Sequence, residues 1–104
     1  MLLDECLPVA LGRELTGHGV DWVTKIGWKG VRNGDLLKRA ADVYDVFITI
    51  DQRLSRNSVL PPTLALVTLS AHSNSITSVR PLVPELLKLL ETIRPGDRIR
   101  LPAD

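Results

Sequence analysis

Acidic side chains at three places in the chain have the most specific chemistry. Asp4 and Glu5 follow a short apolar start, Asp51 follows the apolar run 46–50, and Asp35 lies between them in the sequence. Because ligands of an open parallel sheet bind outside the carboxyl ends of its strands, carboxylates that follow two strands are expected to meet there. Such carboxylates repel one another unless a cation lies among them, and hard oxygen ligands suit Mg²⁺ or Mn²⁺. The sequence therefore predicts a metal-binding acidic site.

Short apolar runs mark the strands that would place these carboxylates. Residues 46–50 are rich in β-branched and aromatic side chains, and residues 64–69 are apolar on both faces, as in a covered parallel strand. Weaker patterns lie at residues 2–3, 20–23 and 98–101, the last of which alternates basic and apolar side chains. The sequence predicts a strand at each of these runs.

Helical periodicity lies between most of these runs. Leucines at a spacing of four predict a helix over about residues 8–17. Asn33 is a natural N-cap and predicts a helix over residues 33–44. A leucine-rich segment predicts a third helix over residues 82–93, and residues 51–62 read as a polar loop or a short helix.

The composition agrees with one folded domain over residues 1–104. Hydrophobic residues make up 44% of the chain, which is ordinary for a folded protein, and the formal net charge is +1. Alternation of apolar strands with helices predicts an α/β fold, a three-layer α/β/α sandwich with a mainly parallel central sheet. The small net charge implies neither a strongly basic surface nor an acidic tail, so it says little about partners.

Features of the chain favour a reducing compartment and no membrane partner. Cys6 is the only cysteine, so no intrachain disulfide can form. The apolar start is interrupted at once by Asp4 and Glu5, unlike a secretory signal peptide. No stretch approaches the roughly 20 apolar residues of a membrane helix. We expect a cytoplasmic protein.

Basic residues gather around the acidic positions. Between residues 25 and 56 there are seven: Lys25, Lys29, Arg32, Lys38, Arg39, Arg53 and Arg56. Cations that flank an acidic site suit the approach of a phosphate backbone. The alternative interpretation is an ordinary solvated face.

Four motifs carry a resemblance to a known family. They are Leu3-Asp4-Glu5-Cys6-Leu7-Pro8, Gly19-Val20-Asp21, Gly34-Asp35-Leu36-Leu37 and Ile48-Thr49-Ile50-Asp51. In this order and spacing they resemble the small bacterial PIN-like proteins, which are relatives of the toxin ribonucleases of toxin–antitoxin systems. The specific part of the resemblance covers about the first half of the chain.

The resemblance implies a PIN-like fold and a divalent-metal-dependent ribonuclease site. Carried over by motif, Asp4, Asp35 and Asp51 are the catalytic carboxylates, and Glu5 joins them as a candidate metal ligand. Mg²⁺ or Mn²⁺ is the implied cofactor. RNA is the implied substrate, and a cognate antitoxin protein and a second copy of the chain are the implied protein partners.

Three further residues are candidates for contact with the substrate. Arg53 and Thr49 are expected to contact phosphate or to position Asp51. Lys29 is expected near the RNA, beside Trp28, which could stack a base or simply anchor its loop.

Departures from the family pattern leave a second function open. Cys6 stands where the family usually has an amide, and Gln52 stands where an aromatic commonly follows the last aspartate. No Asp or Glu occurs between Asp51 and Glu85, although many PIN nucleases carry a fourth acid there. The alternative is a catalytically inactive PIN-like module that binds RNA or a protein partner.

A phospho-acceptor receiver domain is a further alternative with the same layers. Asp4 and Glu5 would hold Mg²⁺, Asp51 would accept the phosphoryl group, and Thr68 or Ser70 would be the switch hydroxyl. Receivers also place a lysine after a fifth strand, where this chain has none, so this alternative is disfavoured.

Overall fold

The chain folds around a five-stranded parallel sheet. The structure, a computed structural model, describes residues 1–102, apart from the side chains of residues 55–57. Its strands pair in the order β2-β1-β3-β4-β5, and every pairing is parallel. The strands are β1 (Leu2–Leu3), β2 (Asp21–Trp22), β3 (Val46–Thr49), β4 (Ala65–Leu69) and β5 (Arg98–Leu101).

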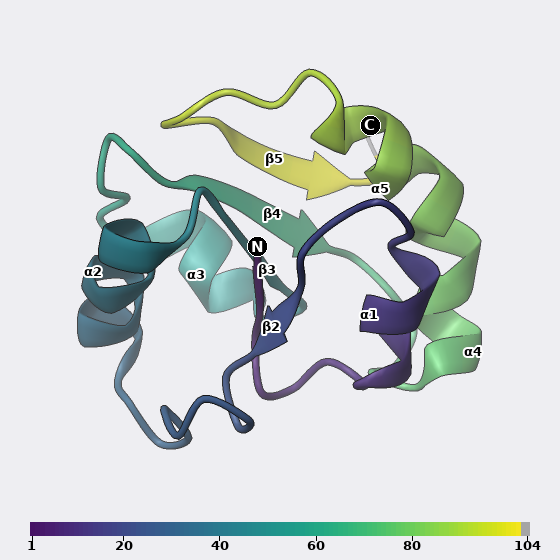
Figure 1. The fold of residues 1–104 in the computed structure, drawn as a ribbon, viewed down its shortest axis with the longest axis horizontal. Helices are drawn as coiled ribbons and strands as arrows, with labels where there is room; N and C mark the ends of the chain where they lie inside the picture. Colours follow the sequence, from purple (N-terminus) through teal and green to yellow (C-terminus); the bar gives the residue numbers. More distant parts are fainter. Residues whose placement is uncertain (103–104) are drawn as a thin grey trace.

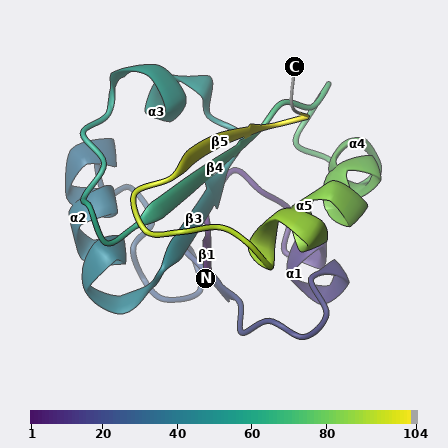
Figure 2. The ribbon, with the colours of Figure 1, turned by 90° about the horizontal axis from the view of Figure 1, so that it is seen from above.

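Helices cover both faces of this sheet, which gives three layers. One face carries α2 (Asn33–Val43) and α3 (Gln52–Asn57), and the other carries α1 (Ala10–Glu14), α4 (Ile76–Val79) and α5 (Val83–Leu90) (Figures 1 and 2). A short 3₁₀ turn, η1 (Arg80–Leu82), joins α4 to α5. The predicted α/β sandwich is therefore present, and its sheet is parallel throughout.

Alternation along the strands divides the core into two halves. Successive side chains of a strand point to opposite faces, so Leu3 and Ile48 pack under α1, α4 and α5, whereas Leu2 and Phe47 pack under α2 and α3. All residues of β3 and β4 are buried, as a parallel sheet covered on both faces requires.

The carboxyl ends of β1 and β3 lie at the point where the strand order reverses. The chain runs outward from β1 to β2 and then returns across β1 to β3, so the direction of the strand order reverses between β1 and β3. In open α/β sheets ligands bind in the crevice at such a reversal, outside the carboxyl ends of the strands. The order is also that of flavodoxin-like sheets, which include receiver domains. Topology alone does not separate the nuclease from the receiver domain considered above.

Strand predictions are confirmed to within one residue at each end, but the helices differ more. The helix predicted over residues 8–17 is limited to Ala10–Glu14, because Leu15 leaves helical backbone angles and Gly17 follows with φ 84°. The N-cap of α2 is Arg32, not Asn33, and no side chain caps this helix. The helix predicted over residues 82–93 ends at Leu90, and the structure adds the short helix α4 before it.

No helix within residues 1–102 has the length and apolar character needed to cross a bilayer.

Candidate functional site

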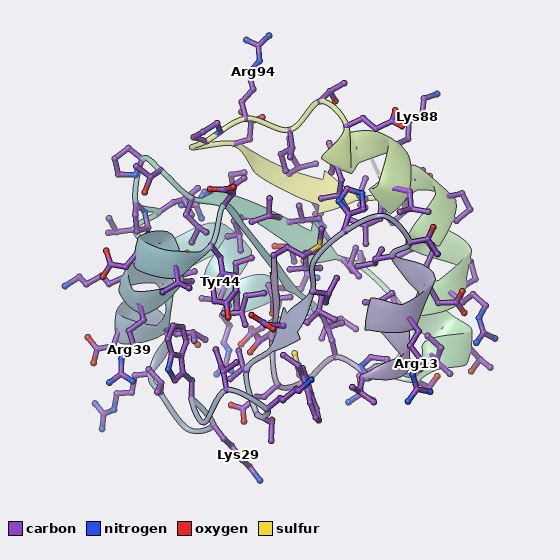
Figure 3. The ribbon with its side chains drawn as sticks, in the orientation of Figure 1. Arg13, Lys29, Arg39, Tyr44, Lys88 and Arg94 are labelled. Carbon is purple, nitrogen blue, oxygen red and sulfur yellow. The ribbon has the colours of Figure 1, made fainter. Side chains whose placement is uncertain are left out.

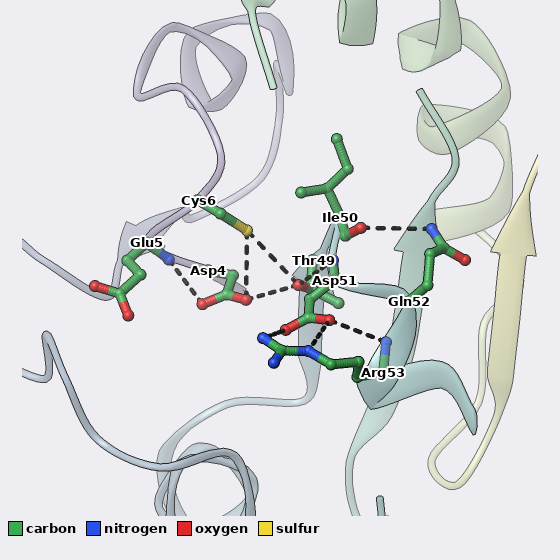
Figure 4. Close-up of polar contacts among 8 residues, drawn as sticks. All are labelled: Asp4, Glu5, Cys6, Thr49, Ile50, Asp51, Gln52 and Arg53. Carbon is green, nitrogen blue, oxygen red and sulfur yellow. Dashed lines mark hydrogen bonds and ion pairs between the residues drawn. The ribbon is translucent and has the colours of Figure 1, made fainter. Parts of the chain in front are cut away.

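Asp4 is a buried carboxylate at the carboxyl end of β1. Its exposed fraction is 7%, and its backbone N–H donates to the carbonyl of Ile48 at 2.9 Å, which continues the pairing with β3. Its Oδ1 accepts the backbone N–H of Glu5 at 2.8 Å, and its Oδ2 accepts the hydroxyl of Thr49 at 2.6 Å (Figure 4). The carboxylate is therefore held in one orientation.

Thr49 links the two acidic strand ends through a single hydroxyl. Its Oγ1 donates to Asp4 and accepts the backbone N–H of Asp51 at 3.0 Å (Figure 4). The side chain is completely buried, so no water competes for these bonds. Thr49 therefore holds the backbone of Asp51, which is one of the two roles expected for it, and its contact with phosphate stays a prediction.

Asp51 caps α3 and forms an ion pair with Arg53. Its Oδ1 accepts the backbone N–H of Arg53 at 2.9 Å and Nε at 3.0 Å, and its Oδ2 accepts Nη2 at 2.8 Å. The hydrogen bond from the Arg53 side chain is the main reason why the pKa of Asp51 lies below its ordinary value. Asp51 is therefore ionised at neutral pH, and a cation already neutralises it.

Two neighbours contribute contacts that the sequence did not indicate. The thiol of Cys6 donates to Asp4 Oδ2 at 3.5 Å, and burial raises the pKa of this thiol, so it stays protonated as a weak donor. The amide of Gln52 donates to the carbonyl of Ile50 at 3.4 Å (Figure 4) and to the carbonyl of Leu69 at 3.2 Å, which ties the end of β3 to the end of β4. A polar side chain directly after a strand end was the only available signal for Gln52.

The remaining predicted residues do not join this group. Glu5 is exposed and its carboxylate points away from Asp51 (Figure 4), and Asp35 is exposed in the first turn of α2. Lys29 projects into solvent from the loop before α2 (Figure 3). Within the described residues, none of these three side chains has a hydrogen-bond or ion-pair partner.

Trp28, the neighbour of Lys29, anchors the loop. It packs against the core on the α2 side, edge-on to Tyr44 with ring centroids 6.3 Å apart, and Arg39 lies 5.9 Å from its ring centroid. The loop-anchoring alternative accounts for its position without a bound base. Of the basic residues counted in the sequence, the side chain of Arg56 lies outside the described part of the chain.

The donor set for a metal ion consists of two carboxylates. No three His, Cys, Asp or Glu side chains of the described residues come together in a way that could hold an ion. Mg²⁺ is commonly bound by only one or two carboxylates, with water and substrate phosphate as its other ligands. Asp4 and Asp51 fit that mode in chemistry, provided that Arg53 releases Asp51. The third and fourth predicted ligands, Asp35 and Glu5, are not part of the group as it stands.

Comparison of the chain with protein-family models, curated proteins and solved structures finds no match.

Two buried threonines give a matched test of the Thr49 bridge. Thr49 and Thr68 are register partners on β3 and β4 and both are fully buried, but Thr68 Oγ1 has no hydrogen-bond partner within the described residues. We expect Thr49→Val to lower the free energy of unfolding by about 1–3 kcal/mol, because it strands the N–H of Asp51 and removes a bond to Asp4. Thr68→Val is expected to be neutral or stabilising. Urea unfolding of both variants measures the free energy of unfolding. An equal decrease in the two variants would contradict a stabilising link from Thr49 to Asp4 and Asp51.

The Arg53 ion pair predicts a pH dependence. Since the pKa of Asp51 is below its ordinary value of 3.8 in the folded protein, the pair stabilises the fold above that pH, and this stability is lost as pH falls through the folded pKa. Arg53→Ala should raise the pKa of Asp51 toward 3.8, as followed by carbon NMR of its carboxyl group. Arg94→Ala, which removes an equal charge from a side chain that projects into solvent (Figure 3), should leave that pKa unchanged.

Proposed function

We propose that this chain is a PIN-like, divalent-metal-dependent ribonuclease that hydrolyses phosphodiester bonds at the edge formed by β1 and β3. The observation that carries the proposal is the junction of Asp4 and Asp51 through Thr49 at the reversal of strand order. Two strand ends far apart in sequence supply acidic groups to one place, where ligands of α/β sheets bind. The resemblance of the four motifs to PIN-like proteins supports the choice of RNA as substrate.

The chain's own residues have separable roles in this proposal. Asp4 and Asp51 would hold Mg²⁺ or Mn²⁺, which when bound lowers the pKa of a water ligand and polarises phosphoryl oxygens. Thr49 keeps the carboxylate of Asp4 in a fixed orientation, since its hydroxyl proton is committed to Oδ2. Asp35 and Glu5 remain proposed contributors to the site.

Arg53 has a role that depends on exchange of partners. Its side chain is 82% exposed, so its pairing with Asp51 is open to competition by ions and by phosphate. A guanidinium binds phosphate with the same paired N–H donors that it uses for a carboxylate. Arg53 therefore moves to substrate phosphate when Asp51 is needed by the metal.

Partners of the proposed nuclease follow from the family. As the toxin of a toxin–antitoxin pair, it would be inhibited by a cognate antitoxin protein that covers the acidic edge. A homodimer is also part of the family proposal. Lys29 remains a proposed RNA contact at the rim.

A catalytically inactive PIN-like module is the second candidate, and one observation favours it. Both oxygens of Asp51 already accept hydrogen bonds from Arg53, so the guanidinium balances the charge of this carboxylate without a metal ion. A protein that binds RNA or a protein partner without cutting it would need nothing more from these carboxylates.

A receiver domain is less well supported. The strand order is compatible with it. However, Lys88, the only lysine after Thr68, lies on α5 and projects into solvent (Figure 3), and the Thr68 hydroxyl is fully buried.

Cleavage of an RNA pool with structured and single-stranded members tests the proposal. We expect cutting by the purified protein with Mg²⁺ or Mn²⁺ and none with chelator. Asp51→Asn should reduce the rate at least about a hundredfold, the scale of losing one charge-stabilising contact. Asparagine is also a good N-cap, so the variant is expected to fold.

Glu85→Gln is the matched control, because Glu85 is an exposed carboxylate on α5, on the far side of the sheet. It should cut at the wild-type rate. Folded wild-type protein that cuts no RNA with either metal would overturn the nuclease and favour the inactive module. Phosphorylation of Asp51 by a small phosphodonor would instead favour the receiver.

A further inference from the structure

A hollow of about 730 Å³ lies on the α2 and α3 side of the sheet and reaches Arg53. Its volume is within the range of small-molecule sites. One wall is apolar and comes from α3 and the segment that follows it, with the side chains of Leu54, Val59, Leu60, Pro61 and Pro62. Val59 is 90% exposed, the most exposed of the large hydrophobic side chains in the described part of the chain.

This apolar wall is fixed in place by the neighbouring edge strand. Arg98 of β5 donates from Nη1 to the carbonyl of Leu54 at 3.0 Å and from Nη2 to the carbonyl of Ser58 at 2.8 Å. The carbonyl of Pro61 accepts the N–H of Leu64 at 3.1 Å, just before β4. These three hydrogen bonds hold the backbone on both sides of Val59 and Leu60.

Basic side chains also line the hollow. Lys38 comes from α2 and Arg53 from α3, and no carboxylate is among the described lining residues, although Asp35 belongs to the same first turn of α2. The first turn of α2 also lines it through Asn33 and Gly34, and this turn has no side-chain cap. Helix N–H groups that lack partners attract anions, and here they act together with a lysine and an arginine. The hollow thus pairs an apolar wall with an anion-binding wall.

We infer that this hollow binds one nucleotide, with its base on the apolar wall and its phosphate at Lys38 and the first turn of α2. Proline rings and branched side chains offer a surface on which a planar base can rest. Arg53 belongs both to the hollow and to the ion pair with Asp51, so a chain that leaves the hollow reaches the acidic edge directly. This last step rests on the proposed function.

The same chemistry has two possible sources, which are a free mononucleotide and one nucleotide of a single-stranded RNA. Fluorescence anisotropy of a short labelled single-stranded RNA, measured with chelator so that no cutting occurs, tests the site. We expect Val59→Glu and Lys38→Glu each to weaken binding at least about tenfold, through loss of base stacking and of a phosphate contact. Both residues are exposed, so neither change should alter the thermal midpoint.

Lys88→Glu makes the same charge reversal on α5, outside the hollow, and should bind like the wild type. Competition with the labelled RNA then separates the ligands. Adenosine monophosphate should displace it, whereas ribose 5-phosphate, which has no base, and decanoate, which has no ring, should not. If adenosine monophosphate displaces the labelled RNA at the same concentration as the unlabelled oligonucleotide does, the ligand is a free nucleotide. If the oligonucleotide competes at a clearly lower concentration, the ligand is RNA.

The inference is overturned if Val59→Glu and Lys38→Glu bind RNA as tightly as Lys88→Glu does, or if ribose 5-phosphate or decanoate competes as well as the nucleotide. Its failure is distinguishable from that of the nuclease. If the wild type cuts RNA and both hollow variants bind RNA undiminished, the nuclease proposal stands and the nucleotide site is ruled out. If binding depends on the base but no metal-dependent cutting occurs, the nucleotide site stands and the nuclease proposal is ruled out.

Discussion

Parallel pairing of β1 with β3 is the constraint on which the rest of the site depends. The register that sets Leu3 against Ile48 brings the next residue of each strand, Asp4 and Thr49, into contact across the two strands. Thr49 also accepts the backbone N–H of Asp51, the N-cap of α3. One hydroxyl therefore fixes the start of α3 relative to the end of β1. Without this pairing, the two aspartates would have no common location.

Competition for Asp51 is the central electrostatic question of this edge. Asp4 accepts hydrogen bonds from three neutral donors, a backbone N–H, a hydroxyl and a thiol. Asp51 is neutralised by a guanidinium that belongs to its own helix. A divalent ion that binds Asp51, or a phosphate group that binds Arg53, would separate this pair. The guanidinium of Arg53 can pair with either the carboxylate of Asp51 or a phosphate group. Arg53 is thus the residue through which metal and substrate would influence each other.

The α2 and α3 face of the sheet combines polar and apolar recognition. Side chains on this face of β1, β3 and β4 are apolar deep in the core and become polar at the carboxyl ends, with Asp4, Thr49 and Thr68 in one row. The hollow lies over the same layer and shares Arg53 with the acidic edge. Base recognition and phosphodiester chemistry, as proposed, would therefore occur on one side of the sheet, and α1, α4 and α5 pack against the other.

The sequence by itself determined the strands and the location of Asp4 and Asp51 at the ends of two of them. Apolar runs such as residues 46–50 are local signals, and the parallel sheet that they imply brings its strand ends to one edge. The donation from Cys6, the pairing of Arg53 with Asp51 and the exposed position of Asp35 were decided only by the tertiary structure. Each depends on distances between side chains of separate elements or on rotamer choice, which spacing along the chain does not contain. The position of the segment after α3 likewise depends on tertiary structure, because Arg98, distant in sequence, donates to the carbonyls of Leu54 and Ser58.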